Sequence, residues 1–264
     1  MVYGWRNDVM RAAVELVLAD HAAGGTGLER LEVCGFEAWH KRSLFSGRAR
    51  WRWGLKRALG ARIPRVAEYF NHSWLLERLF ETPLPLAAGE IVAGGLPVRQ
   101  FLFSRHVDDA PTLETVLSDR AHPEREAILA QLAREVARMH ALGFVHHDLY
   151  PRNVLVRGSG HARRLLFLDA WAGGPPPQWR DAAYDLGCLW LFADTELAPE
   201  ELAGFQARYA AERTVQARPV DAPGLFARAL AARERLITRL EARAHERRGR
   251  PLPGEIPRHG EESR

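Results

Sequence analysis

The segment 143–171, GFVHHDLYPRNVLVRGSGHARRLLFLDAW, constrains the fold more than any other part of the sequence, because it sets polar side chains at the ends of two short apolar runs. The runs VLV (154–156) and LLFL (165–168) are joined by RGSGHAR, whose Gly and Ser residues are typical of a tight connection. The pattern predicts an antiparallel hairpin. In such a hairpin the start of the first strand lies beside the end of the second. Asn153 and Asp169 are therefore expected to be neighbours in space.

Asp148 lies on the loop that leads into this hairpin, so one end of the hairpin is expected to gather two carboxylates and an amide. Oxygen ligands of this kind suit a hard cation, and Mg²⁺ is the usual one. Asp and Asn beside strands are also common turn and cap residues. The spacing His-x-Asp-x-x-x-x-Asn, followed by an apolar hairpin that ends in Asp, is typical of phosphoryl transfer on a kinase-like fold. The combination favours a kinase over plain turns and caps.

The length of 264 residues allows one large domain or two lobes that share a cleft. No apolar run approaches the roughly 20 residues of a membrane span, and the N-terminus lacks the features of a signal peptide. Cys34 and Cys188 lie far apart without metal-ligand spacing, which favours reduced core cysteines. We expect a cytoplasmic protein, with a peripheral position at the inner membrane as one option.

The character of the predicted elements changes near residue 104, from β-rich to mostly helical. The earlier part contains an alternating hairpin over 28–41, a helix over 65–80 and two β-rich runs in EIVAGGLPVRQFLFSRHV. The helix is expected to turn five apolar side chains inward: Val66, Phe70, Leu75, Leu76 and Leu79. We predict an α+β fold with a first lobe over 1–103, a second over 104–248, and a disordered tail over 249–264.

The chain resembles the lipopolysaccharide kinase family, small kinase-like proteins that phosphorylate Kdo or heptose of the lipopolysaccharide inner core. HALGFVHHDLYPRNVLV is similar to the catalytic loop of that family, and LFLDAW to its metal-binding strand end. HKR and the later AEYFN…LLERLFETPLP resemble its strand Lys, helix Glu and Pro-containing connection. The resemblance covers roughly residues 28–195. It implies a two-lobed protein-kinase-like fold that uses ATP and Mg²⁺.

The resemblance also implies roles for five residues. Asp148 is expected to act as the base, or as the orienting carboxylate, for the acceptor hydroxyl. Asn153 and Asp169 are expected to hold Mg²⁺ on the ATP phosphates. Lys41 would reach the α- and β-phosphates, and Glu68 would pair with Lys41. The plain alternative is that Lys41 opens a solvated basic run and that Glu68 is a surface residue.

Other residues are expected to support this site. His146 would support the catalytic loop, while His147 stands where protein kinases usually have Arg. A metal site on both is disfavoured, because adjacent residues of an extended chain point to opposite faces. Asp185 is expected to brace the catalytic loop, with Asp181 ranked second. Glu77 is a rival to Glu68.

The sequence departs from protein kinases in several parts. It has no G-x-G-x-x-G, its DAW replaces Asp-Phe-Gly, and no Ala-Pro-Glu follows Asp169. The missing parts argue against a peptide substrate. Two alternatives to a lipopolysaccharide kinase stay open: a soluble small-molecule kinase of the aminoglycoside or choline type, and a kinase-like binding protein without activity.

The stretch 41–65 carries nine Lys or Arg and no acidic residue, with Trp51 and Trp53 among them. Cations with interfacial aromatics suit an anionic membrane surface, where a kinase acting on a lipid acceptor would work. The alternative is a solvated loop whose tryptophans pack on the first lobe. We expect no nucleic acid as a partner, because the chain lacks a recognised binding fold.

Overall fold

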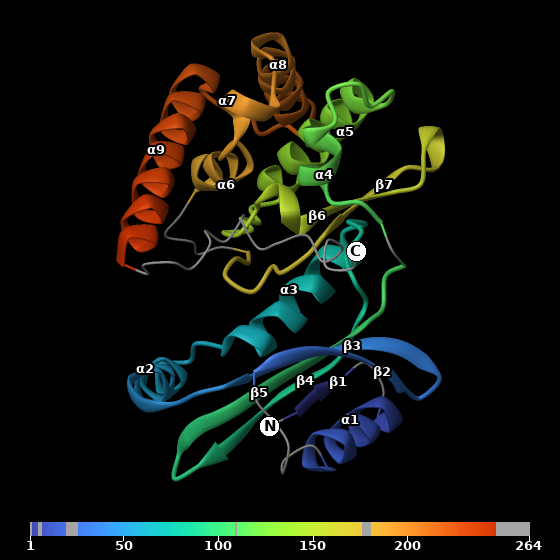
Figure 1. Ribbon diagram of the computed structural model, residues 1–264, viewed down its shortest axis with the longest axis vertical. Coiled ribbons are helices and arrows are strands. Elements are labelled where there is room, and N and C mark those ends of the chain that lie inside the picture. Colours follow the sequence, from blue (N-terminus) through green and yellow to red (C-terminus); the bar gives the residue numbers. More distant parts are fainter. Residues whose placement is uncertain (1, 5–6, 20–25, 109, 176–180, 247–264) are drawn as a thin grey trace, which may run out of the picture.

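The structure is a computed structural model, and it describes residues 2–4, 7–19, 26–108, 110–175 and 181–246. Its elements form two halves: an antiparallel sheet with a helix on either side, and a mostly helical half stacked on it along the long axis (Figure 1). The predicted α+β class is confirmed.

The five strands of the sheet are β1 (Val2–Gly4), β2 (Gly27–Val33), β3 (Phe36–Leu44), β4 (Pro85–Ala93) and β5 (Leu96–Arg105). Their order is β1-β4-β5-β3-β2, and all neighbours are antiparallel. The predicted hairpin over 28–41 is confirmed as β2–β3. Its turn residues Cys34 and Gly35 both have positive φ, 50° and 78°, as a two-residue hairpin turn of matching twist requires.

The two faces of the sheet are covered by different helices. Helix α1 (Asn7–Ala19) covers one face and helix α3 (Pro64–Glu77) lies on the other (Figure 1). The ring of His40 stacks on Phe103, which belongs to the apolar cluster under α1. Side chains alternate along a strand, so Lys41, the next residue of β3, points to the face where α3 lies.

Helix α3 has a more polar inward face than the sequence predicts. Val66 and Leu75 are buried as expected, but Glu68, Asn71 and His72 are buried beside them. The expectation that Leu79 faces inward is wrong. Leu79 lies past the end of the helix with φ 61° and is exposed. The inward face of α3 therefore contacts polar groups of the protein as well as the apolar core.

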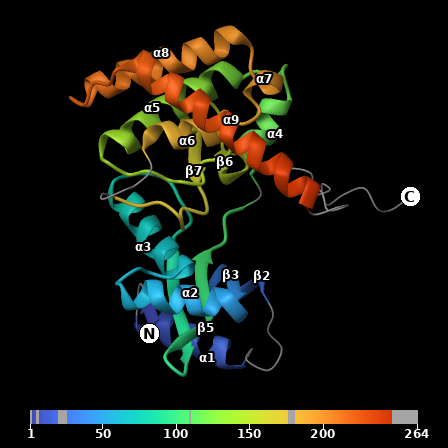
Figure 2. The same cartoon turned by 90° about the vertical axis from the view of Figure 1, so that its left-hand side faces the viewer.

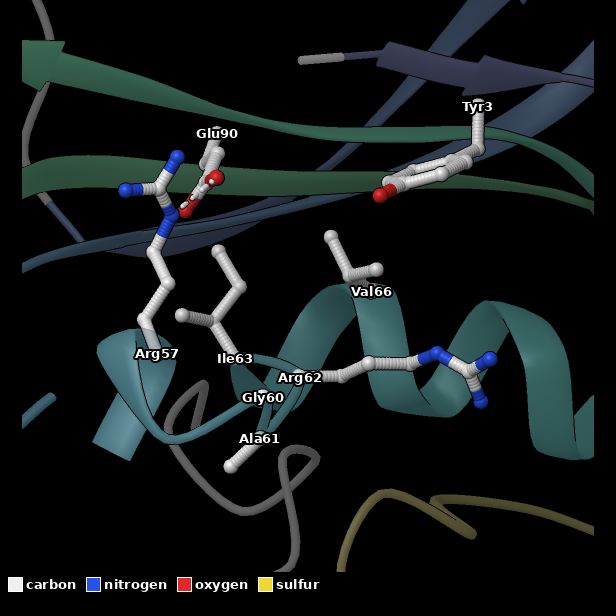
Figure 3. Close-up of a pocket in the computed structure, with 8 residues that line it drawn as sticks. All are labelled: Tyr3, Arg57, Gly60, Ala61, Arg62, Ile63, Val66 and Glu90. Carbon is white, nitrogen blue, oxygen red and sulfur yellow. Dashed lines mark hydrogen bonds and ion pairs between the residues drawn. The ribbon is translucent and has the colours of Figure 1, made fainter.

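The basic stretch contains helix α2 (Gly47–Ala58), so the alternative of a solvated loop there is wrong. A pocket of about 450 Å³ lies between the α2–α3 connection, β1 and β4 (Figure 3). Ile63 and Val66 supply part of its apolar wall, and Arg57 Nε lies 2.6 Å from Glu90 Oε1 at one side. This ion pair ties α2 to β4.

The second half is built around one large apolar cluster. Its longer helices are α4 (Leu113–Ser118), α5 (Arg125–Ala141), α6 (Ala182–Leu189), α8 (Pro199–Val215) and α9 (Ala222–Glu246), with the short α7 (Ala193–Glu196) between α6 and α8. A single-turn helix, η2 (Pro151–Asn153), leads into β6 (Val154–Arg157), and a second, η3 (Gly160–Ala162), joins it to β7 (Arg164–Phe167). Strand β6 pairs antiparallel with β7, Val154 opposite Phe167. The predicted hairpin of the opening segment is confirmed.

The last strand of the sheet ends at Arg105 and the first helix of the second half begins at Leu113. The connection thus lies near the expected boundary between 1–103 and 104–248, and the division into two functional lobes stays a prediction. The expected tail over 249–264 lies outside the described residues. Among the helices that the structure describes, none has the length and apolarity that crossing a membrane requires.

Candidate active site

The loop between α5 and β6 is held by a buried carboxylate. Asp185 of α6 accepts hydrogen bonds from the backbone N–H groups of His146, at 2.6 Å, and His147, at 2.7 Å. Its Oδ2 also lies 3.2 Å from His140 Nε2. Burial would raise the pKa of Asp185, but the His140 hydrogen bond and the other contacts outweigh it, and the pKa lies below its usual range. The ionised carboxylate thus fixes the loop from beneath.

Asp181, the rival for this bracing position, lies elsewhere. It caps the N-terminus of α6, where its Oδ1 accepts the Ala183 N–H at 3.1 Å. Its other oxygen lies 3.5 Å from Arg228 Nε at the surface. Asp181 does not contact the loop through either group, so the two acidic residues of this segment have separate structural tasks.

Hydrogen bonds gather Asp148, Asn153 and Asp169 at one end of the β6–β7 hairpin. Asn153 Nδ2 donates to the Asp148 carbonyl at 2.8 Å, and the Asn153 carbonyl accepts the Leu168 N–H at 2.8 Å. Asp169 follows directly with φ 56°, a left-handed conformation that turns the chain sharply after the strand. The neighbour relation expected from the hairpin is present.

Lys41 crosses from the sheet to this end of the hairpin. Its Nζ lies 2.7 Å from Glu68 Oε1 and also contacts Asp169 Oδ1. The other Glu68 oxygen lies 2.6 Å from Arg65 Nη1, and the Glu68 side chain is fully buried. Glu77, the rival, lies at the end of α3 with a side chain 71% exposed, and pairs with Arg78. The structure thus brings Lys41, Glu68 and Asp169 together and leaves Glu77 apart.

The charged groups of this cluster stabilise one another in their ionised forms. Burial would lower the pKa of Lys41, but Glu68 and Asp169 outweigh it and the pKa is raised. Burial would likewise raise the pKa of Asp169, but the Lys41 charge and hydrogen bond outweigh it and the pKa is lowered. Asp148 differs, because burial raises its pKa to about 6 against the opposing charge of Arg152. Two carboxylates at the same end thus have different proton affinities.

The donor set fits a magnesium ion. The Asn153 amide nitrogen is engaged by the Asp148 carbonyl, which leaves its amide oxygen for a hard cation, and ionised Asp169 offers a second oxygen. Within the described residues, no group of three or more His, Cys, Asp or Glu side chains is suited to a metal ion. A cation here would take its remaining ligands from phosphates and water, as Mg²⁺ commonly does.

The two adjacent histidines have different surroundings and different contacts. His146 is fully buried, and burial lowers its pKa, so the neutral ring packs beneath the loop. His147 has φ 63°, and its Nδ1 lies 2.9 Å from the Ala172 carbonyl oxygen. His147 thereby holds the segment after Asp169 against the loop, a contact that the sequence reasoning missed.

Asn71 of α3 was also missed. Its Nδ2 donates to the carbonyls of Ala170, at 2.6 Å, and Gly173, at 2.9 Å. It lies three residues after Glu68, which puts both on one face of the helix. A Cβ on Gly173 would stand 2.0 Å from the Val145 carbonyl oxygen, so this position accommodates only glycine. The segment after Asp169 is therefore fixed between α3 and the loop.

Known proteins are similar to this chain in sequence and in fold. The sequence profile of the lipopolysaccharide kinase (Kdo/WaaP) family matches residues 31–182. Over 88 residues the chain is 35% identical to the O-antigen chain terminator bifunctional methyltransferase/kinase WbdD of Escherichia coli. That match spans 33% of this chain but only 12% of the length of that relative.

Two solved structures agree in fold. WaaP, in a complex with acyl carrier protein, superposes with a TM-score of 0.59 at 20% identity, over 89% of this chain and 99% of that chain. A glucosamine kinase superposes with a TM-score of 0.52 at 16% identity, over 86% of this chain and 75% of that chain. Since the family profile covers more than half of the sequence, the chain belongs to the lipopolysaccharide kinase (Kdo/WaaP) family, and its fold is kinase-like.

Proposed function

We propose that this protein transfers the γ-phosphate of ATP to a sugar hydroxyl of the lipopolysaccharide inner core, on Kdo or heptose. The observation that carries the proposal is the position of Lys41 Nζ between Glu68 and Asp169, at the end of the hairpin that also holds Asp148 and Asn153. This arrangement matches what phosphoryl transfer requires, since catalysis there is mostly positioning and charge stabilisation. Membership of the family supports the acceptor class.

Each residue has a distinct task in this proposal. Lys41, held by Glu68, binds the α- and β-phosphates. Asn153 and Asp169 hold Mg²⁺, which when bound neutralises charge on the transferred phosphoryl group. Asp148 orients the acceptor hydroxyl and accepts its proton. Its raised pKa of about 6 keeps the carboxylate ionised at neutral pH yet more basic than an ordinary Asp, as general base catalysis favours.

We also propose that the protein meets its acceptor at an anionic membrane through α2. Six exposed residues share the outward side of this helix, here called the outer face: Arg48, Trp51, Arg52, Leu55, Lys56 and Leu59. Its apolar members recur every four residues, which aligns them in one stripe, and are 69%, 66% and 79% exposed. An apolar stripe between cations fits the boundary between headgroups and acyl chains.

The other side of α2 is bound to the sheet, which supports this orientation. Arg50 donates to the Ala93 carbonyl and Arg57 pairs with Glu90. Gly54 packs so tightly on Leu96 that a Cβ would stand 2.4 Å from its Cδ2. The two inner arginines are thus engaged within the protein. On the outer face, Arg48 and Arg52 are exposed, and Lys56 is exposed with its Nζ 4.7 Å from the centroid of the Trp53 ring.

The kinase proposal is tested by ADP release with Mg-ATP across three acceptor groups: core saccharides, aminoglycosides with choline, and proteins. We expect release with core saccharides alone. Glu68→Gln should lower the rate strongly, because Lys41 loses its charged partner, whereas Glu77→Gln on the same helix should not. Turnover of an aminoglycoside or choline instead would move the assignment to a small-molecule kinase. Mg-ATP binding without turnover of any acceptor would contradict the kinase proposal.

A further inference from the structure

Trp171 lies beside the catalytic loop, although the reaction described above does not use it. Its backbone N–H donates to the Asp169 carbonyl at 2.8 Å, closing the turn after the strand. The residues that follow run along the loop, where the Ala172 carbonyl contacts the His147 ring and Gly174 exchanges hydrogen bonds of 3.2 and 3.0 Å with Val145. These bonds fix the position of Trp171 on the loop that carries Asp148.

Trp171 is 39% exposed, although the preceding residue, Ala170, is fully buried. Its indole interacts with the Asp148 carboxylate and favours the charged form. The indole N–H is the only polar group of this side chain, so an N–H directed at the carboxylate leaves the apolar ring face to a ligand. A pyranose ring has an apolar face of C–H groups, which an exposed indole can cover.

The second residue near Asp148 is Arg152, whose charge lowers the Asp148 pKa. It lies in the single turn Pro151–Asn153, is half-buried, and holds its guanidinium 4.3 Å from the centroid of the Tyr150 ring. Its charge is the strongest influence that keeps Asp148 ionised. Within the described residues, no carboxylate forms an ion pair with Arg152. Stacking on Tyr150 pre-organises a planar group that can bind carboxylate or phosphate through two hydrogen bonds.

We propose that Trp171 and Arg152 form the acceptor subsite of this enzyme, for a saccharide that carries a carboxylate or a phosphate near the hydroxyl to be phosphorylated. Trp171 covers the apolar face of the sugar ring, and Arg152 binds the anionic group. Together they direct the hydroxyl toward Asp148. The inference rests on the proposed function, which it deepens by naming the charge and shape of the acceptor.

Matched acceptor pairs test the subsite. One pair is a sugar acid and its methyl ester, and the other is a phosphorylated core saccharide and its dephosphorylated form. The wild-type enzyme should prefer the charged member by about 10- to 100-fold in kcat/KM, the range of one charge-assisted bond. Arg152→Gln should abolish that preference, while the loss of its charge near Asp148 should lower the rates of both members of each pair alike. Arg157→Gln, an exposed arginine on β6, is the matched control and should change nothing. The pair that shows the effect identifies carboxylate or phosphate.

Trp171 is tested on the same acceptors. Trp171→Ala should raise the acceptor KM for both members of each pair alike, while Trp171→Phe, which keeps an aromatic face, should restore most of the affinity. The affinity for Mg-ATP should stay unchanged in both variants, which also checks folding. An unchanged acceptor KM in Trp171→Ala would refute its part. Equal losses on charged and uncharged acceptors in Arg152→Gln would leave the charge preference intact and would overturn the proposal.

A measurement of acceptor binding without turnover can test this inference independently of the kinase proposal. Calorimetry of the acceptor pairs on the Asp148→Asn protein, with Mg-ADP present, measures acceptor recognition without turnover. A charge preference that depends on Arg152 supports the subsite even if wild-type turnover fails. Equal binding of charged and uncharged members refutes the subsite even if the enzyme proves to be a lipopolysaccharide kinase.

Discussion

The catalytic loop (145–153) and helix α2 (Gly47–Ala58) are both crowded with polar and charged residues, yet they use them in opposite ways. In the loop, the groups are buried and bonded to one another, as Asp185 binds two successive backbone N–H groups. In α2, no residue is buried, and the outer face turns cations and apolar side chains outward together. Burial of a charge is costly without a partner. The difference teaches that buried charge comes with its partner inside the protein, whereas the charge on the outer face of α2 stays available for the membrane that we propose as its partner.

The largest effect is expected from substitutions that remove the carboxylates of the proposed active site. Asp148→Ala should cut phosphoryl transfer by at least about a hundredfold, because it removes the proton acceptor. Mg-ATP binding should hardly change, since Asp148 acts on the acceptor. Asp169→Ala should weaken Mg-ATP binding as well, because it removes a metal ligand and a Lys41 contact. Single-turnover rates and nucleotide titration measure the two quantities. If both variants behave alike at near-normal rates, the assigned roles are wrong.

The next prediction tests the bracing of the loop. Asp185→Ala leaves two buried N–H groups without acceptors, and each should cost about 1–3 kcal/mol of unfolding free energy. Asp181→Ala is the matched control on the same helix. It removes only an exposed cap and should cost about 0.5–2 kcal/mol. Denaturant unfolding measures both. A smaller loss in Asp185→Ala than in Asp181→Ala would contradict the description of the loop as internally fixed.

The third prediction separates the two sides of α2. Changing Arg48, Arg52 and Lys56 to Gln should weaken binding to anionic vesicles by about a hundredfold at low salt, since each cation adds about 1 kcal/mol. Changing Arg50 and Arg57 to Gln should destabilise the fold instead, because both are bonded to the sheet. Wild-type binding should weaken as salt rises. Vesicle sedimentation measures the loss of binding, and thermal melting measures the loss of stability. Binding without preference for anionic lipid would leave α2 as a purely structural helix.

The smallest expected effect is on pH dependence. Burial raises the pKa of Asp148 to about 6. Below that value the carboxylate is protonated and cannot accept the hydroxyl proton, so kcat/KM should fall about tenfold per pH unit. Vesicle binding through α2 does not involve Asp148, so it should not fall with the rate. A kcat/KM that stays level between pH 7 and 5 would argue against Asp148 as the base.

The hairpin end of the site is predictable from sequence because its contacts are local. The antiparallel pairing of β6 with β7 is set by two apolar runs and a short connection, and it alone brings Asn153 next to Asp169. The spacing from Asp148 to Asn153 is equally visible along the chain. Lys41 and Glu68 can be suggested only by the resemblance, because nothing in their own segments distinguishes them from solvated residues.

The rest depends on contacts between distant segments. Asn71 bonds to carbonyls about a hundred residues further along the chain, and a helix with Asn and His on its inward face gives no apolar pattern to detect. Apolar periodicity therefore placed Leu79 inside and overlooked Asn71. For the segment of α2, the sequence leaves a solvated loop open as an alternative. Arg, Lys and Leu are good helix formers, and two ties to the sheet offset part of the repulsion.

The two hydrogen bonds of Asn71 have a consequence for regulation. They join the helix that bears Glu68 to the stretch just after Asp169, so one cannot shift without the other. Separating them would leave a buried amide and two carbonyls unsatisfied, at about 1–3 kcal/mol each, and every 1.4 kcal/mol makes an open form about tenfold rarer. These bonds therefore favour the arrangement in which Glu68 and Asp169 both contact Lys41, even without a ligand. Under the proposed function, its rate then follows the supply of ATP and acceptor.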